Sequence, residues 1–361
     1  MKYQIGEICE IVSGSTPKTS IAEYWDGNVK WITPAELDDD SYVIQDTVRK
    51  ITELGVKKTG LTILPKGTVL FSSRAPIGKV AIAGCDMYCN QGFKNLICSD
   101  VINNKYLYWY LKSKTTYLNS LGRGATFKEL SKKILAEVEL EVPHIKRQNE
   151  IVQRLERLCS IKKKRLEQLQ KLDELIQARF VELFGEPILN PKEWKIVTIG
   201  DIALDVHYGT SRPAVEGGKY PYLRMNNLTI DGHLDLTDLK YIDIPEEELE
   251  KCVVRKGDIL FNRTNSLELV GKTAVFDLCE DMVIAGYIIR VRLNNKMILP
   301  EIFSQYMNHK TLKKILRGMA KGAVNQANIN AKELQSIKIY VPNMKLQDEF
   351  VTFVNQVNKS K

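Results

Sequence analysis

The sequence lacks the marks of a secreted or membrane-bound protein. Its seven cysteines are odd in number and scattered, which argues against a disulfide framework. Cys85 and Cys89 lie close together, but no second pair of zinc-ligand spacing follows, so we expect no metal site. No apolar run reaches the length of a membrane span, and the N-terminus lacks the apolar segment of a signal peptide. These absences predict a cytoplasmic protein without membrane contact.

Signs of catalysis are equally scarce. The four histidines are dispersed, and none neighbours a serine or cysteine in a triad arrangement. The glycine-rich cofactor loop and the Asn- or Asp-Pro-Pro-aromatic motif of a methyltransferase are both absent. Residues 266–273 resemble a phosphate loop, but Ser266 stands where the first glycine of that loop belongs. Residues 193–195 have the Glu-x-Lys end of a nuclease site, but the Pro-Asp pair of such a site is absent. We therefore expect no catalytic residue and no cofactor in this chain.

A long helix is predicted over residues 143–186. The stretch is rich in strong helix formers, opens at Pro143, and closes at Gly185 and Pro187. About 40 residues at about 1.5 Å each make a rod of roughly 60 Å, which needs a partner to cover its apolar stripe. Apolar residues at alternating spacings of four and three form a coiled-coil seam, interrupted by Lys162, Arg165 and Arg179. The seam residues are Ile151, Leu155, Leu158, Leu169, Leu172, Ile176 and Leu183.

The chain also repeats itself on either side of this helix. Residues 31–37, 64–71, 78–81 and 135–143 match residues 222–228, 254–261, 271–274 and 334–342 in the same order. After the last match, Lys146, Gln148, Glu150 and Val152 correspond to Lys345, Gln347, Glu349 and Val351. The repeat predicts a domain at 1–142, the helix at 143–187, a second domain at 188–342 and the start of a second, shorter helix at 343–361.

Each predicted domain mixes short strands with late helices, which indicates an α+β fold rather than regular β-α-β alternation. The expected strands are 68–72, 80–83, 259–262, 287–293 and 337–341, and the expected helices are 105–118 and 300–316. The second domain should also have a strand at 274–276.

Polar loops at corresponding places in the two halves suggest the kind of ligand. Arginine pairs bidentately with guanine, and asparagine or glutamine with adenine, while lysine, hydroxyls and backbone amides suit phosphate. The net charge of +8 permits a polyanionic partner without demanding one. The candidate nucleic-acid contacts in the first domain are Lys18, Arg74, Asn90, Gln91 and Arg123, with Lys18 nearer phosphate. In the second domain they are Arg212, Arg224, Asn226, Arg263, Asn265, Asn325 and Gln326.

The duplicated order resembles the specificity subunit of type I restriction–modification systems. The resemblance covers the whole chain, and the duplicated order is more specific than any single motif in it. It is carried by the domain openings at residues 5–17 and 199–202, the two Lys-Gly turns, residues 89–93, and the strand–Pro–Gln-x-Glu pattern at each helix start. The sequence LFGEP followed by EWK after the long helix is also typical of the family.

This resemblance implies a non-catalytic DNA reader. Each target-recognition domain would bind one half of a bipartite site in double-stranded DNA, and the helices would form an antiparallel spacer that sets the gap between half-sites. The resemblance also implies two methyltransferase subunits that carry S-adenosylmethionine and methylate a flipped adenine, and a restriction subunit with motor and nuclease activity.

One departure from the family concerns the distal helix. Family members have a distal helix comparable to the central one, whereas only residues 343–361 follow Pro342 here. We therefore expect part of the antiparallel partner to be missing and the seam from Leu169 onward to be poorly covered, which would weaken assembly with two methyltransferase subunits.

Two alternatives remain open at this point. The chain could be a scaffold or adaptor whose paired domains bind proteins, or an enzyme whose site has no familiar motif. Salt dependence separates DNA binding from the adaptor, because contacts to several phosphates weaken steeply as salt is added.

Overall fold

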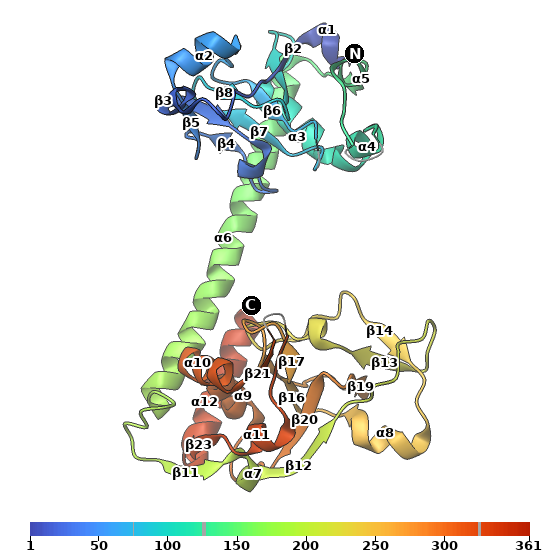
Figure 1. Ribbon diagram of the computed structural model, residues 1–361. Coiled ribbons are helices and arrows are strands. Elements are labelled where there is room, and N and C mark those ends of the chain that lie inside the picture. Colours follow the sequence, from blue (N-terminus) through green and yellow to red (C-terminus); the bar gives the residue numbers. More distant parts are fainter. Residues whose placement is uncertain (75, 125–127, 324–325) are drawn as a thin grey trace. The chain divides into compact units, whose positions relative to one another are not determined.

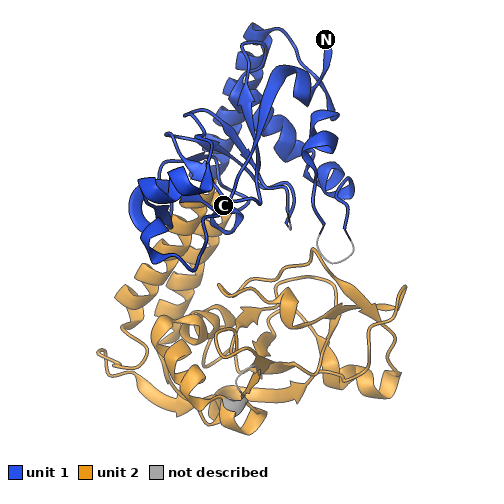
Figure 2. Ribbon diagram, turned by 45° about the horizontal axis from the view of Figure 1, so that its top comes forward, with its two compact units in different colours: residues 1–164 blue, residues 165–361 orange. Residues whose placement is uncertain are grey.

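The computed structural model describes residues 1–74, 76–124, 128–323 and 326–361. The chain divides into two compact units, residues 1–164 and 165–361 (Figure 2). Helix α6 (Ile145–Phe184) runs through the boundary between them. The sequence instead predicts the helix as a separate part between residues 142 and 188, and that four-part division stays a prediction. None of the described helices is long and apolar enough to cross a bilayer.

Unit 1 contains short strands and helices before the start of α6 (Figure 1). Its strands are β1 (Lys2–Gln4), β2 (Cys9–Ser13), β3 (Trp25–Ile32), β4 (Val43–Ile44), β5 (Lys50–Ile51), β6 (Val69–Phe71), β7 (Val80–Ala83), β8 (Tyr88–Cys89), β9 (Lys94–Cys98) and β10 (Glu139–Glu141). Its helices are α1 (Ile5–Ile8), α2 (Glu53–Thr59), α3 (Asn104–Ser113), α4 (Thr115–Ser120) and α5 (Lys132–Ala136), with single 3₁₀ turns at Ala22–Tyr24 and Pro34–Glu36.

The described residues of unit 2 follow a similar order of elements, with additions and without a counterpart of β4. Its strands are β11 (Lys195–Thr198), β12 (Ala203–Tyr208), β13 (Tyr220–Leu223), β14 (Lys240–Ile242), β15 (Val253–Val254), β16 (Ile259–Asn262), β17 (Thr264–Asn265), β18 (Thr273–Val275), β19 (Met282–Ile284), β20 (Ile288–Leu293), β21 (Lys321–Ala323), β22 (Gln326–Asn328) and β23 (Lys338–Val341). Its helices are α7 (Ile199–Ile202), α8 (Glu246–Cys252), α9 (Pro300–Asn308), α10 (Lys310–Met319), α11 (Ala331–Gln335) and α12 (Met344–Ser360), with a 3₁₀ turn at Met225–Asn227.

The two units share their sheet topology. The main sheet has the order β2-β9-β6-β7-β4 in unit 1 and β12-β20-β16-β18 in unit 2. A second sheet has the order β5-β3-β8 in unit 1 and β14-β13-β19-β15 in unit 2, and in both units its parallel pair joins corresponding strands, β3 with β8 and β13 with β19. The internal repeat and the predicted α+β class are therefore confirmed.

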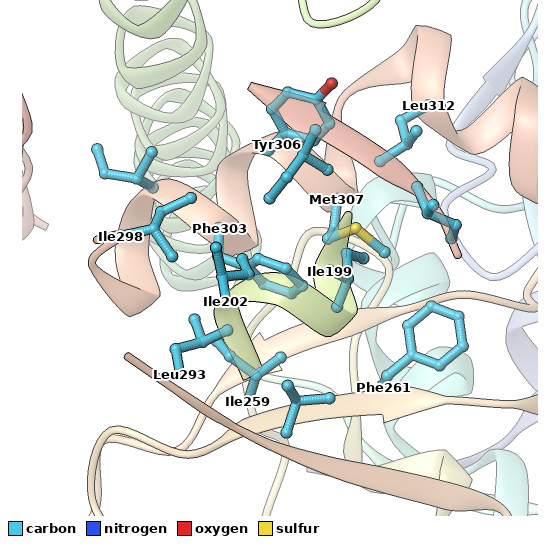
Figure 3. Packing of buried hydrophobic residues seen from close by; sticks show 14 of the residues in the cluster. Ile199, Ile202, Ile259, Phe261, Leu293, Ile298, Phe303, Tyr306, Met307 and Leu312 are labelled. Atoms are coloured by element: carbon cyan, nitrogen blue, oxygen red, sulfur yellow. The ribbon is translucent and has the colours of Figure 1, made fainter. Parts of the chain in front are cut away.

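Strand alternation explains how each main sheet separates two cores. In β16, Ile259 and Phe261 point into one cluster of buried side chains and Leu260 points into another. In β6, Val69 and Phe71 face one cluster and Leu70 faces the other. Figure 3 shows Phe303 and Met307 of α9 packed with Ile199, Ile202 and Ile259 in the larger core of unit 2.

A fully buried glutamine lies at the start of α6 and another at the start of α12. The Gln148 amide accepts a hydrogen bond from the Asn103 backbone N–H (2.8 Å) and donates to the carbonyls of Val101 (2.9 Å) and Pro143 (2.8 Å). In unit 2, Gln347 accepts from the backbone N–H of Leu299 (2.8 Å) and donates to the carbonyls of Met297 and Pro342 (both 2.9 Å). Each amide therefore joins the helix start to the loop before α3 or α9.

Helix α12 covers the C-terminal part of α6, so the expectation about the seam is wrong. Arg179 pairs with Glu349 near the start of α12 (2.6 Å), and Asp173 pairs with Lys361 just beyond its end (2.5 Å), so the two helices are antiparallel. The seam from Leu169 onward is partly or fully buried, and Ile176 belongs to the core of unit 2. The exposed stretch is instead 157–168, which includes the seam residue Leu158, because α12 starts beside the C-terminal end of α6.

We expect Gln148→Leu and Gln347→Leu each to lower the free energy of unfolding by about 2–4 kcal/mol, because each change removes the side-chain partner of one N–H and two carbonyls that are partly or fully buried. Urea unfolding measures the loss, and hydrogen exchange read by mass spectrometry assigns it to unit 1 or unit 2. The matched controls are Gln153→Leu on α6 and Gln356→Leu on α12, both exposed, where we expect a change within about 0.5 kcal/mol. Equal effects at buried and exposed positions would contradict the role given to the amides.

Candidate nucleic-acid interface

Loops from four places in unit 1 meet at one end of its main sheet. The Ser15 N–H donates to the Cys89 carbonyl (3.0 Å), which joins the loop after β2 to the loop after β8. The Ser73 N–H donates to the Gly92 carbonyl (2.8 Å), and the Ser73 carbonyl accepts from the Leu130 N–H (2.8 Å). We call residues 15–16, 73–74, 90–92, 123–124 and 128–130 the strand-end cluster of unit 1.

An ion-pair network occupies the centre of this cluster. Glu129 pairs through one carboxylate oxygen with Arg74 (3.0 Å) and through the other with Lys94 (3.3 Å). The backbones of Arg123 and Glu129 exchange two hydrogen bonds (3.0 and 2.9 Å), and Glu129 also bridges to Arg74, so Glu129 lies between the two predicted arginines. Partial burial disfavours the charged form of Glu129, but the hydrogen bonds from Arg74 and Lys94 prevail and lower its pKa.

The other predicted residues of unit 1 divide between this cluster and its surroundings. Gln91 is exposed and accepts a hydrogen bond from the Thr16 hydroxyl. Asn90 is half-buried, and its side-chain oxygen accepts from the Gly92 N–H (2.8 Å), so this side chain shapes the loop. Lys18 lies farther along its loop, where its carbonyl accepts from the Trp25 indole (3.2 Å) and its exposed side chain makes no ion pair with the described residues.

Unit 2 builds the same cluster with the same backbone hydrogen bonds. The Thr210 N–H donates to the Ile284 carbonyl (2.9 Å), as Ser15 does to Cys89. The Arg263 N–H donates to the Tyr287 carbonyl (2.9 Å), and the Arg263 carbonyl accepts from the Ile329 N–H (2.9 Å), as Ser73 does with Gly92 and Leu130. Residues 210, 263–265, 286–287 and 326–329 form the strand-end cluster of unit 2.

Arg263 is the basic side chain at the centre of this second cluster. Its guanidinium lies over the ring of Tyr208, 4.8 Å from the ring centroid, and donates to the Gly286 carbonyl (3.4 Å). Its Nε is buried without a hydrogen-bond partner. Asn265, a residue of β17, donates to the side chain of Asn262 (2.8 Å). Strand β17 pairs with β22, and β22 carries the exposed residue Gln326. The predicted residue Asn325 lies outside the described residues.

Three predicted residues of unit 2 are not in this cluster. Arg212 makes a bidentate ion pair with Glu248 of α8 (2.6 and 3.0 Å). Arg224 pairs with Asp238 (2.8 Å) at the end of β13, and exposed Asn226 lies two residues farther on. The contacts of these side chains do not assign them to DNA or exclude them from it, so they stay predictions.

Sequence reasoning missed the carboxylate and the aromatic ring that position the central arginines. Glu129 is 55 residues from Arg74, and Tyr208 is 55 residues from Arg263, so sequence proximity gives no sign of either contact. Glu129 lies opposite both Arg74 and Arg123 in antiparallel backbone pairing. A correct prediction of this strand register would therefore have identified Glu129 as their neighbour.

The lysines of the matched segments 78–81 and 271–274 have the same structural role in both units. Lys79 donates its ammonium group to the Leu37 carbonyl, and Lys272 donates to the carbonyls of Met225 (2.7 Å) and Leu228 (2.5 Å). Leu37 and Leu228 correspond in the repeat. Buried Lys272 therefore points into the protein, and the phosphate-loop interpretation of residues 266–273 finds no support in its contacts.

Comparison with known proteins gives a consistent family. The model of the type I restriction modification DNA specificity domain matches residues 1–171 and again 191–361. The type I restriction enzyme MjaIX specificity subunit of Methanocaldococcus jannaschii is 40% identical over 249 residues, or 62% of this chain and 57% of that subunit. The EcoKI specificity subunit of Escherichia coli is 24% identical over 256 residues, or 66% of this chain and 55% of that subunit.

Solved structures show the same fold. The S subunit of a type I restriction-modification system from M. genitalium matches all of this chain and 89% of its own, with a TM-score of 0.55 and 18% sequence identity. A second structure comes from work on complex assembly and conformational transition of the type I R-M system. It matches all of this chain and 90% of its own chain, with a TM-score of 0.60 and 19% sequence identity. The chain nevertheless aligns with little more than half the length of the two curated relatives.

We expect Glu129→Gln to destabilise unit 1 at pH 7 by less than about 1 kcal/mol, since the pairs are partly exposed. A carboxyl with a lowered folded-state pKa stabilises the fold above its unfolded pKa, about 4.3, and that contribution disappears as pH falls through the folded pKa. The difference between wild type and variant in urea unfolding should therefore shrink in acid. A difference that stays constant from pH 7 into the acid range would contradict the ion-pair assignment, and Arg74→Ala should raise the pKa of Glu129 in an NMR titration.

Proposed function

Because the chain belongs to the type I restriction modification DNA specificity family, we propose that it is a DNA-recognition subunit, itself non-catalytic. Each unit would bind one half of a bipartite site in double-stranded DNA. The single observation that carries this proposal is the duplicated strand-end cluster. The two clusters share three backbone hydrogen bonds but present different side chains, as two readers of different half-sites require.

The chemistry of the clusters suits DNA rather than a small substrate. Arg74, Arg123, Gln91 and Arg263 supply the groups that bind guanine, adenine and phosphate. Arg263 is held by the face of Tyr208 and not by a carboxylate. Its guanidinium can therefore contact DNA without first breaking an ion pair. The stacked ring also limits the rotamers of the arginine, which lowers the entropy cost of binding.

The proposal assigns the helices a second role. Helices α6 and α12 would set the gap between half-sites and dock methyltransferase subunits, which would bring S-adenosylmethionine to an adenine flipped from the duplex. A restriction subunit would join the same assembly. The exposed apolar side chains Leu158, Ile161 and Leu166 support a role in docking, because their spacing places them on one face of α6, and a grouped apolar surface is typical of an interaction site.

The decisive experiment maps methylated adenines across the genome of cells that carry this chain with its methyltransferase subunit, against cells without this chain. A two-part motif with a fixed unspecified gap, present only with this chain, is the expected result. Absence of any motif, with both proteins produced and assembled, would reject the proposed function.

We expect Arg263→Ala to relax or abolish recognition of one half-site and to leave the other unchanged, because Arg263 belongs only to the cluster of unit 2. Loss of a good bidentate base contact costs about 1–3 kcal/mol of discrimination. The methylation map reads both half-sites at once. Arg74→Ala is the matched variant in unit 1 and should affect the opposite half-site. Equal loss of both half-sites, or of neither, would contradict the assignment.

Deletion of residues 158–164 tests the spacer. These seven residues lie in the exposed stretch of α6, so their removal takes away no buried side chain. One heptad shortens the helix by about 10 Å and rotates it by about 20°. We expect either loss of methylation or a methylated motif whose gap is shorter by about three base pairs at 3.4 Å each. Wherever a motif survives, its half-site sequences should be unchanged. A changed half-site with an unchanged gap would contradict the spacer role.

A further inference from the structure

Helix α10 of unit 2 has one apolar and one strongly basic face. Leu312 and Leu316 are buried in the core of unit 2. The basic residues follow at spacings of three and four, so they lie together on another face of the helix. They are Lys310, Lys313, Lys314 and Arg317.

These four side chains line a cleft of about 460 Å³ that lies wholly within unit 2. The cleft is bounded by α6, α10, the C-terminal end of α12 and the loops around residues 231 and 269. Three carboxylates also line it, those of Asp173, Asp231 and Glu268, and Asp173 is paired with Lys361. Across the described residues of unit 2, none of the four basic groups of α10 has a carboxylate oxygen within 4.0 Å.

Lys313 is the most buried of the four basic side chains. Its ammonium group donates to the Gly271 carbonyl and to no carboxylate among the described residues of unit 2. Burial, with the nearby charges of Arg317 and Lys272, lowers the pKa of Lys313 to about 7. An anion in the cleft would favour the charged form of this lysine.

The basic face lies beside the strand-end cluster of unit 2. Gly271, which holds Lys313, donates its N–H to the Asn262 carbonyl (2.9 Å), and the Asn262 N–H donates to the Lys272 carbonyl (2.8 Å). Asn262 is followed directly by Arg263 at the centre of that cluster. Through Gly271, Lys313 is therefore tied to the end of β16 at which the strand-end cluster of unit 2 lies.

Unit 1 lacks this feature although its backbone is equivalent. There the hydroxyl of Thr115 reaches the carbonyl of Gly78 (3.5 Å), where Lys313 reaches the carbonyl of Gly271 in unit 2. Helix α4, which begins at Thr115, has the sequence TTYLNS and no basic residue. The basic face is thus an addition to one half of a duplicated scaffold.

We propose that the basic face of α10 binds phosphates of the DNA backbone next to the half-site that unit 2 reads. This inference rests on the proposed function and adds a sequence-independent contact to it. Unpaired lysines and arginines at helical spacing suit a polyanion, because each contact releases counterions from the DNA. Because unit 1 has no equivalent helix face, this contribution to affinity comes from one side of the bipartite site only.

The test compares two double variants of the full chain, each assembled with its methyltransferase subunit. Lys310→Ala/Lys314→Ala removes two exposed cations from the proposed surface and keeps the half-buried Lys313. Lys256→Ala/Lys296→Ala is the matched control. Lys256 precedes β16 and Lys296 follows β20, and the register of these strands places both at the opposite end of the sheet from Arg263.

Equilibrium binding is measured from low to high salt on duplexes that contain the methylated motif and on scrambled duplexes. We expect the α10 variant to bind both duplexes about 10-fold more weakly at moderate salt and its salt slope to fall by about 2, with the preference for the motif unchanged. The control should keep the slope of the wild type.

Three results would overturn the inference. The first is a wild-type slope and affinity in the α10 variant. The second is an equal loss in the control, which would show only an effect of net charge. The third is loss of methyltransferase assembly with unchanged DNA affinity, which would assign the face to an acidic protein surface. Failure of the proposed function would be seen separately, because the wild type would then show no preference for the motif. The salt slope measured on scrambled DNA would still test the role of α10.

Discussion

The two buried glutamines are the interaction on which the rest of the architecture depends. A helix can leave a domain in a defined direction only if the polar backbone groups at its start find partners. Gln148 and Gln347 each supply one such partner, to the carbonyl of Pro143 or Pro342 just before α6 or α12, and each also holds the loop before a domain helix. Because an amide in the interior is costly unless all its hydrogen bonds are made, the geometry around each glutamine is narrowly constrained. The direction of each helix relative to the sheet of its own unit follows from that constraint. In unit 2 the same constraint places α12 antiparallel to α6, where Phe350 packs edge-on against Phe180 and Phe184.

Much of this fold could be predicted from the sequence, because its determinants are local. Strands β7 and β16 begin and end at the predicted residues, since each is a continuous apolar run bounded by turns. The duplicated order of motifs predicted the duplicated sheet topology. The cover of α6 could not be predicted, because it depends on which end of α6 meets the start of α12.

The candidate site was predictable only as a set of loops. Arg74, Arg123 and Arg263 do lie in the strand-end clusters, but their partners Glu129 and Tyr208 are brought near by strand pairing over many residues.

Electrostatics distinguish the arginines of the two clusters. Arg74 is paired with Glu129, whereas Arg263 rests on an aromatic ring. A partly exposed ion pair contributes at most about 1 kcal/mol, so DNA can displace Glu129 at little cost in stability. The carboxylate still repels phosphate, which disfavours non-specific binding more than binding to a site that offers a bidentate base contact. Arg263 pairs with no carboxylate among the described residues, so in the proposed function discrimination by unit 2 would come from the placement of the guanidinium itself. The pairing of Arg212 with Glu248 and of Arg224 with Asp238 repeats the arrangement of unit 1 at the margin of unit 2.

The separation of backbone from side chain would explain how one scaffold serves the two different half-sites of the proposed function. The bonds that close each cluster run between main-chain groups: Ser15 with Cys89 and Thr210 with Ile284, or Ser73 with Gly92 and Arg263 with Tyr287. The corresponding side chains differ: Ser73 is fully buried and donates its hydroxyl to the Gly92 carbonyl (3.1 Å), whereas Arg263 is half-buried. The closing bonds are the same in both units although these side chains differ. Helix α10 follows the same rule, because its apolar face is held in the core while its opposite face is free to gain charge. Affinity and specificity can therefore diverge independently in the two halves while the fold stays constant.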